Sequence, residues 1–188
     1  IDDVMAQYQD VCTTVDSKII EKWFNNLNWG PEKLEEERRH IAAKHHMGFT
    51  TEVSGNWSII YDIYKNALAR IRKDFPHLED ITMLGGHSSH SYLTGTNVYF
   101  VYDYYVKACG PEDERMKYHQ AIHSLILEET LKAGGSIGHH HGIGKYRTEW
   151  IQREHDSAYY IMEGLKKQFD PNGIMNCGTI YPVKNDPV

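Results

Sequence analysis

The chain has 188 residues, of which 40% are hydrophobic and 24% are charged, and its formal net charge is −6. This is the length of one domain, and the apolar content is too high for a disordered chain. The acidic charge argues against a nucleic-acid-binding protein, which would neutralise phosphates with Lys and Arg. No apolar run approaches the roughly 18 residues that a membrane span requires.

The cysteines are too few and too scattered for a disulfide framework, and no CxxC pair indicates a zinc ribbon; they are Cys12, Cys109 and Cys177. We therefore expect a reducing compartment and a cytoplasmic location, with a peroxisomal one as the alternative in a eukaryote. The chain begins at Ile1 with no signal-peptide pattern. The missing initiator Met leads us to expect that the chain is a piece of a longer protein.

The first fifty residues are predicted to be helical. Asp16 is a candidate N-cap for a helix over Ser17–Asn28, and a second helix over Glu32–His46 follows Pro31. A third, strongly amphipathic helix is predicted over Trp57–Lys73.

In the middle of the chain the side-chain pattern changes from the helical period to the period of two that is typical of strands. Asp80–Ser91 and Asn97–Val106 are rich in β-branched and aromatic residues, and the turn residues between them predict an antiparallel pair. Within the second strand, alternation places Tyr99, Val101 and Asp103 on one face, and Phe100, Tyr102 and Tyr104 on the other.

Two further helices are predicted. One runs from Pro111 to Leu131 with a core stripe of Met116, Ile122, His123, Ile126 and Leu127, and the other runs from Thr148 to Phe169. Long helices combined with a strand hairpin indicate the α+β class, an antiparallel sheet covered by helices with a helical N-terminal segment.

A triple histidine, His139-His140-His141, lies between these helices and is framed by glycines. Glycine-flanked loops often present reactive groups, and histidine is a common general base and metal ligand. In an extended segment His139 and His141 would face one cavity and His140 the other side. The alternative is a polar loop whose histidines only bond backbone carbonyls.

The glycine-rich string over residues 134–145, with Asp170-Pro171-Asn172-Gly173-Ile174-Met175-Asn176 after it, resembles FAD-dependent oxidoreductases of the vanillyl-alcohol oxidase type. The triple histidine is most similar to the alkyldihydroxyacetonephosphate synthase branch. This resemblance implies a ferredoxin-like C-terminal substrate (cap) domain over residues 1–188. It also implies FAD as cofactor, bound mainly by an N-terminal domain outside this chain, so that the fragment alone is inactive.

The resemblance also implies roles for single residues. Tyr99 and His139, His140 and His141 would be catalytic; Arg38, His87 and His90 would bind substrate, and Asn176 would contact the cofactor. Without the resemblance, Tyr99 is a packed aromatic residue and Arg38 a solvated one. The reaction implied is the exchange of the acyl group of an acylated dihydroxyacetone phosphate for an alkyl group, as in ether-lipid synthesis.

Two other functions stay open. One is an FAD-linked 2-hydroxy-acid dehydrogenase of the D-lactate or glycolate type. The other is a non-catalytic metal-binding domain that uses His139, His141 and His87 or His90, which is disfavoured because adjacent histidines rarely supply two zinc ligands without strain. We expect no metal, a lipid-like or hydroxy-acid substrate, the FAD domain as partner and no nucleic acid. Membrane-surface association and the oligomeric state stay open.

Overall fold

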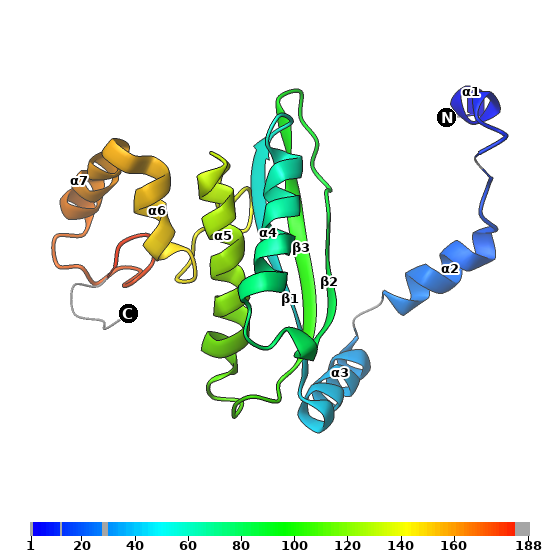
Figure 1. Ribbon diagram of the computed structural model, residues 1–188, viewed down its shortest axis with the longest axis horizontal. Helices are drawn as coiled ribbons and strands as arrows, with labels where there is room; N and C mark the ends of the chain where they lie inside the picture. Colours follow the sequence, from blue (N-terminus) through cyan, green and yellow to red (C-terminus); the bar gives the residue numbers. More distant parts are fainter. Residues whose placement is uncertain (1, 12, 28–29, 183–188) are drawn as a thin grey trace. The chain divides into compact units, whose positions relative to one another are not determined.

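The computed structural model describes residues 2–11, 13–27 and 30–182 (Figure 1). The chain divides into two compact units, Ile1–Lys44 and His45–Val188. The expectation that residues 1–188 form one domain stays a prediction.

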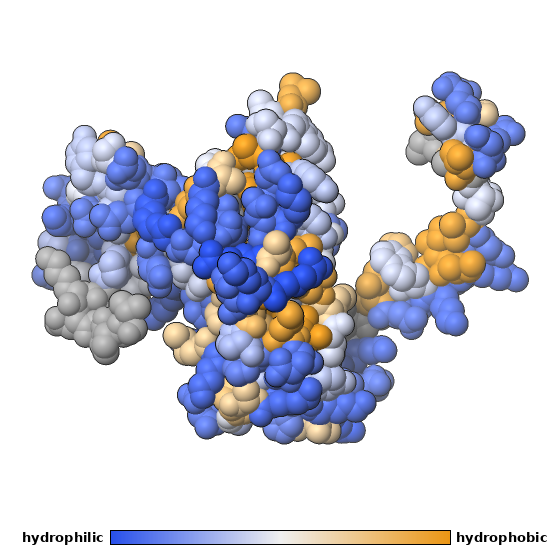
Figure 2. Space-filling view, in the orientation of Figure 1, coloured by the Kyte–Doolittle hydropathy of each residue, from blue (hydrophilic) through white to orange (hydrophobic). Residues whose placement is uncertain are grey.

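The described residues of the first unit form three helices, α1 (Asp2–Gln7), α2 (Ser17–Asn26) and α3 (Pro31–Lys44). The predicted cap of α2 is confirmed, because the Asp16 carboxylate accepts a hydrogen bond from the Lys18 N–H at 2.9 Å. The predicted end of this helix at Asn28 lies outside the described residues. The apolar side chains of α2 are exposed, as the orange surface over this helix in Figure 2 shows; they are Ile19, Ile20, Trp23 and Phe24, and the C-cap residue Leu27 is exposed as well.

The second unit is built on a three-stranded antiparallel sheet of β1 (His46–Asn56), β2 (Ile81–His87) and β3 (Gly95–Tyr105). The strand order is β1-β3-β2, so that β3 is central. The predicted β2–β3 hairpin and the α+β class are therefore confirmed. β2 is shorter than the predicted Asp80–Ser91, whereas β3 begins two residues before and ends one residue before the predicted Asn97–Val106.

The expectation that the first fifty residues are helical is wrong after Lys44. His45 has a φ of 51°, which ends the helical path, and the edge strand β1 starts at the next residue. Several residues of β1 are small or polar, so its pattern lacks a clear apolar period. Its strand conformation is supported by pairing with β3 along its whole length.

Helices α4 (Ile60–Asp74) and α5 (Ala121–Lys132) pack against one face of the sheet (Figure 1). Phe100, Tyr102 and Tyr104 of β3 are fully buried on that face, as alternation predicts. Tyr99, Val101 and Asp103 are half-buried on the opposite face. The core that fixes the sheet therefore lies on one side, and the other side is available for chemistry.

The remaining helices differ from the prediction in two places. The segment before α5 is a π-helical turn, η2 (Arg115–Gln120), in which Met116 is 58% exposed and does not belong to the core stripe. The helix expected over Thr148–Phe169 is split into α6 (Thr148–His155), η3 (Asp156–Ala158) and α7 (Tyr159–Phe169). The break occurs because Asp156 has a φ of 44°. A further short turn, η1 (Leu78–Asp80), precedes β2.

Among the described helices, none combines the length and the apolar character that are needed to cross a bilayer.

Candidate functional site

The open face of the sheet carries one row of three neighbouring side chains. Glu52 on β1 and His87 on β2 are both direct partners of Tyr99 on the central strand β3. Directly opposed residues in an antiparallel pair have side chains on the same face, about 4.5–5.5 Å apart. The strand register therefore brings a carboxylate, a phenol and an imidazole together.

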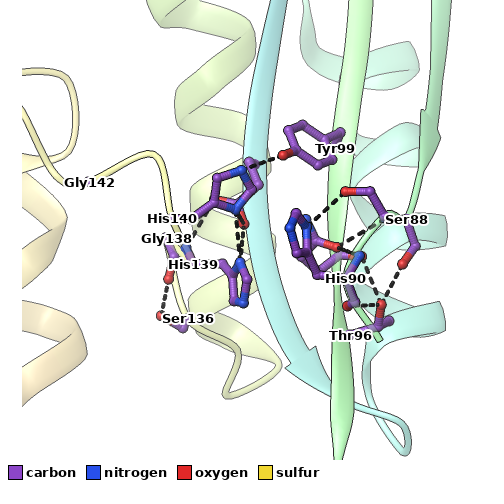
Figure 3. Close-up of polar contacts among 12 residues, drawn as sticks. Ser88, His90, Thr96, Tyr99, Ser136, Gly138, His139, His140 and Gly142 are labelled. Carbon is purple, nitrogen blue, oxygen red and sulfur yellow. Dashed lines mark hydrogen bonds and ion pairs between the residues drawn. The ribbon is translucent and has the colours of Figure 1, made fainter. Parts of the chain in front are cut away.

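Tyr99 is the centre of this row. Its hydroxyl oxygen forms a short hydrogen bond with Nε2 of His140 (Figure 3). The His87 ring stacks on the Tyr99 ring at 4.9 Å between centroids, and the His141 ring meets its edge at 5.2 Å. Three of the histidines singled out from the sequence thus contact the predicted tyrosine.

The triple histidine lies on a bent loop rather than on an extended strand. The segment is tethered to β1 by a pair of backbone hydrogen bonds between Ser136 and Ser54, and Gly142 has a φ of 73°. The side chains of this loop therefore do not alternate as they would on a strand. The expectation that His139 and His141 share one side and His140 faces the other is wrong. His139 and His140 turn to the same side, with their Nδ1 atoms 2.9 Å apart.

Glu52 lies beneath this histidine pair and is completely buried. Its Oε2 accepts a hydrogen bond from the backbone N–H of His139 at 2.9 Å. Its Oε1 lies 3.3 Å from Nδ1 of His139 and 3.4 Å from Nδ1 of His140. The histidine loop is the cover that removes this carboxylate from solvent.

His90, in the segment after β2, lies beside His139 and His140. Together with Glu52, His87, Tyr99 and His141, these residues are called the histidine cluster below. The His90 ring lies 4.7 Å from that of His140 and 5.3 Å from that of His139, centroid to centroid (Figure 3). One nitrogen from each of these three rings lies within 4.8 Å of the others, a donor set that can hold a metal ion. This set differs from the predicted one, because His140 takes the place of His141.

A cleft of about 520 Å³ adjoins the cluster at His141. Its walls combine aromatic and apolar side chains with ionisable ones; they include Phe49, Val101, Asp103, His119, His123, Ile143, Tyr146 and Arg147. Arg147 is buried, and its guanidinium donates to the carbonyl oxygens of Gly142 and Glu52, each at 2.9 Å. It therefore fastens the histidine loop to β1.

Two buried imidazoles form the polar floor of this cleft. His119 bonds the Tyr102 hydroxyl at 3.0 Å, and His123 bonds the Thr51 hydroxyl at 2.9 Å. Burial, together with the positive charges of Arg115 and Arg147, lowers the pKa of His119 to about 4. Burial, with Arg147 nearby, lowers the pKa of His123 to about 3. Both rings are therefore neutral at physiological pH. Partial desolvation also lowers the pKa of His141.

Two predicted site residues lie elsewhere. Arg38 is on α3 in the first unit and is exposed. Asn176 is exposed in the C-terminal segment, with a φ of 48°, and its carbonyl accepts a hydrogen bond from the Thr179 N–H. Their substrate-binding and cofactor-binding roles stay predictions.

Sequence reasoning missed Glu52 and Arg147. Glu52 was overlooked because β1 was not recognised as a strand, although the β-branched residues Thr50, Thr51 and Val53 around it are a strand signal. Arg147 precedes α6 with no local pattern to mark it, because its partners are 5 and 95 residues away in the chain.

The model of the C-terminal domain of FAD-linked oxidases matches residues 20–180. The uncharacterized FAD-linked oxidoreductase YgcU of Escherichia coli K12 is 61% identical over 184 residues, which are 98% of this chain and 38% of that protein. The chain therefore spans little more than a third of the length of this relative.

Alkyldihydroxyacetonephosphate synthases are more distant. The protein of Dictyostelium discoideum is 25% identical over 146 residues, covering 77% of this chain and 23% of the synthase. A solved alkyldihydroxyacetonephosphate synthase structure matches with a TM-score of 0.44 and 20% identity, over 70% of this chain and 20% of that one. The family match covers most of the sequence, and the chain therefore belongs to the FAD-linked oxidases, as their C-terminal domain.

Proposed function

We propose that this chain is the substrate side of an FAD-dependent enzyme of the alkyldihydroxyacetonephosphate synthase type. In this proposal the Tyr99 phenol moves a proton at the substrate carbon, and the acyl group of an acylated dihydroxyacetone phosphate is exchanged for an alkyl group. The observation that carries the proposal is the hydrogen bond between Tyr99 and His140 on the open face of the sheet. The triple histidine and the similarity to the synthases support this choice of reaction.

The chemistry of the cluster suits the removal of a proton next to a carbonyl group. Such a step needs a base that is held within hydrogen-bond distance of a proton carrier. The Tyr99 hydroxyl can pass its proton to Nε2 of His140 and then accept one from the substrate. His87 and His141, which flank the Tyr99 ring, supply imidazoles beside the oxyanion that would develop.

The substrate also carries a carboxylate or phosphate that a guanidinium would bind through two parallel hydrogen bonds. Arg147 adjoins the cleft, but its terminal nitrogens already donate to two backbone carbonyls. Arg147 therefore holds the histidine loop in place, and substrate binding by Arg38 stays a prediction.

The cluster fits the reactive ring of FAD rather than its phosphates. Its members are a phenol, imidazoles and a buried carboxylate, and Arg147, the cation beside them, is occupied by carbonyls. When bound, FAD would supply an electron-accepting ring beside the substrate carbon, and the chain would orient the substrate against it. We propose that the pyrophosphate is held by a part of the full-length protein outside this chain.

This proposal predicts that the purified 188-residue chain folds without flavin. Its core is formed by its own helices and sheet, so we expect cooperative thermal unfolding of a colourless protein that is inactive alone. Absorbance and circular dichroism measure both properties. A stoichiometric flavin spectrum would place the cofactor site within the chain, and a dye-binding molten state would show that the chain depends on other parts of the protein.

The function is tested with the full-length flavin-loaded protein. Incubated with a palmitoylated dihydroxyacetone phosphate and hexadecanol, it should release palmitate and form the alkyl ether, both measurable by mass spectrometry. The control omits the alcohol, which should abolish the ether. Absence of the ether while a dye acceptor is reduced by D-lactate or glycolate would replace the proposal with the second candidate.

That second candidate is an FAD-linked 2-hydroxy-acid dehydrogenase. The observation that favours it is the group of three nitrogens from His90, His139 and His140, which can hold a metal ion that binds the hydroxyl and carboxylate of such a substrate. A stoichiometric metal in protein purified without a histidine tag, together with dye reduction, would support it.

A further inference from the structure

We propose that Glu52 is a positioning residue for Tyr99, which it controls through the tautomer of His140. This inference rests on the proposed function, because it assigns the cause of the proton transfer that the function requires. Glu52 differs from Tyr99 and His140 because its side chain is completely buried and therefore cannot touch the substrate.

The burial of this carboxylate has a free-energy cost that its surroundings must offset. A buried carboxylate is normally paired with a cation or fully hydrogen-bonded. Among the described residues, the ion-pair partners of Glu52 are two imidazoles, and Arg147 bonds its backbone carbonyl instead of its carboxylate. Oε1 has no well-formed hydrogen bond and faces Nδ1 of both His139 and His140.

The position of Oε1 decides which nitrogen of His140 carries a proton. In a neutral imidazole one nitrogen donates and the other accepts, and the partner of one nitrogen fixes the role of the other. Oε1 of the carboxylate can only accept, so it favours a proton on Nδ1 of His140. Nδ1 of His139 lies 2.9 Å from the same atom, and it is also an acceptor when Nε2 of His139 donates to the Tyr92 hydroxyl at 2.8 Å. Nε2 of His140 is then an acceptor and is directed at the Tyr99 hydroxyl.

The backbone fixes this arrangement. Glu52 and Tyr99 are paired residues of adjacent strands, so their separation is set by the β1–β3 ladder. The Oε2 hydrogen bond to the His139 N–H holds the loop directly above the carboxylate. During the reaction the phenol O–H bond breaks and its proton binds Nε2 of His140. The Glu52 carboxylate then faces the imidazolium cation that forms.

The experiment uses the full-length flavin-loaded enzyme with Glu52→Gln and Glu52→Asp. The amide can donate to Nδ1 and so favours the wrong tautomer, whereas aspartate keeps the acceptor. We expect E52Q to lower kcat by about 10- to 100-fold with KM nearly unchanged, and E52D to recover part of the loss. In a Y99F background, E52Q should change kcat less than twofold, because the two residues act as a unit.

Glu154 provides a matched control. Its carboxylate also supports the histidine loop, through the Ser136 hydroxyl at 2.5 Å and the Ile137 N–H at 3.1 Å, but neither of these partners is a histidine of the cluster. Glu154→Gln should therefore leave kcat within about twofold. Equal losses in E52Q and E154Q would show that Glu52 only holds the loop, and would overturn the inference.

A readout independent of activity is the ¹⁵N NMR spectrum of histidine-labelled protein, with His140 assigned from H140N. We expect protonated Nδ1 in the wild type and in E52D, and protonated Nε2 in E52Q. The same tautomer in all three proteins would overturn the inference, as would an unchanged E52Q effect in the Y99F background. If Y99F itself keeps normal turnover, the proposed function fails, and the NMR result still decides whether Glu52 sets the tautomer.

If E52Q does not fold, E52D provides the decisive comparison. The shorter side chain retracts the carboxylate from His140, so kcat should fall when Tyr99 is present and should not fall further in the Y99F background. An equal decrease in both backgrounds would contradict the inference.

Discussion

Replacing Tyr99 by phenylalanine in the full-length enzyme is expected to lower turnover by about 100-fold or more, the loss that follows removal of a general acid–base group. The substitution deletes the hydroxyl that bonds His140 and keeps the ring, which stacks on His87 and meets His141 edge-on. Stability should therefore change little, because the hydroxyl lies on the open face of the sheet rather than in the core. Steady-state kinetics and thermal unfolding measure the two effects.

Tyr105 is the matched control for this prediction. It lies on the same strand and the same face as Tyr99 and is half-buried, but its ring packs on His46 instead of the histidine cluster. Tyr105→Phe should keep near-normal turnover. Similar losses in both variants would indicate a general effect on β3, and normal turnover in Y99F would remove Tyr99 from the mechanism.

The double variant Y99F/H140N extends the test. Residues that act as one unit show non-additive losses, so the double variant should be little worse than the more impaired single variant. If the fold-loss of turnover in the double variant equals the product of the two single losses, the phenol and the imidazole act in separate steps.

Acid is expected to destabilise the second unit well before its carboxylates titrate. The pKa of His119 is lowered to about 4 and that of His123 to about 3, both mainly by burial, whereas an unfolded histidine titrates near 6.5. Between these values the unfolded state binds more protons than the folded state, so the free energy of unfolding falls as the pH falls. The stabilisation is complete above about pH 6.5 and declines towards pH 4 and below.

The expected loss is on the order of 2–5 kcal/mol between pH 7 and pH 4, since each unit of pKa difference corresponds to about 1.4 kcal/mol and solvent screening reduces the sum. Urea unfolding of the 188-residue chain at several pH values measures it. The variant H119N/H123N should be less stable at pH 7 and should show a flatter dependence on pH. An unchanged slope would assign the acid effect to other groups.

The local pattern of the sequence predicted β3 and the helices on its covered face. Alternation in residues 98–104 separates the buried aromatic side chains from Tyr99, because successive side chains of a strand point to opposite faces. The apolar stripe of α4 and the Asp16 cap of α2 are equally local properties. The glycine-framed histidines also identified the loop that meets Tyr99.

The tertiary structure decided how these parts meet. β1 has no clear apolar period, and its pairing with β3 places Glu52 beside Tyr99, a contact between residues 47 positions apart. The turn of His139 and His140 to one side depends on the ties to Ser54, Gly142 and Arg147. The break at Asp156 is likewise a backbone conformation that the helical pattern around it does not signal.

The sequence by itself therefore determined the α+β class, the covered and open faces of β3, and the histidines and tyrosine that are candidates for the chemistry. The register between β1 and β3, and with it the carboxylate beneath the histidine pair, was decided only in the folded chain. The physical reason is that periodicity reports which side of its own element a residue faces. The partner that a side chain meets depends on hydrogen bonds between segments far apart in the sequence.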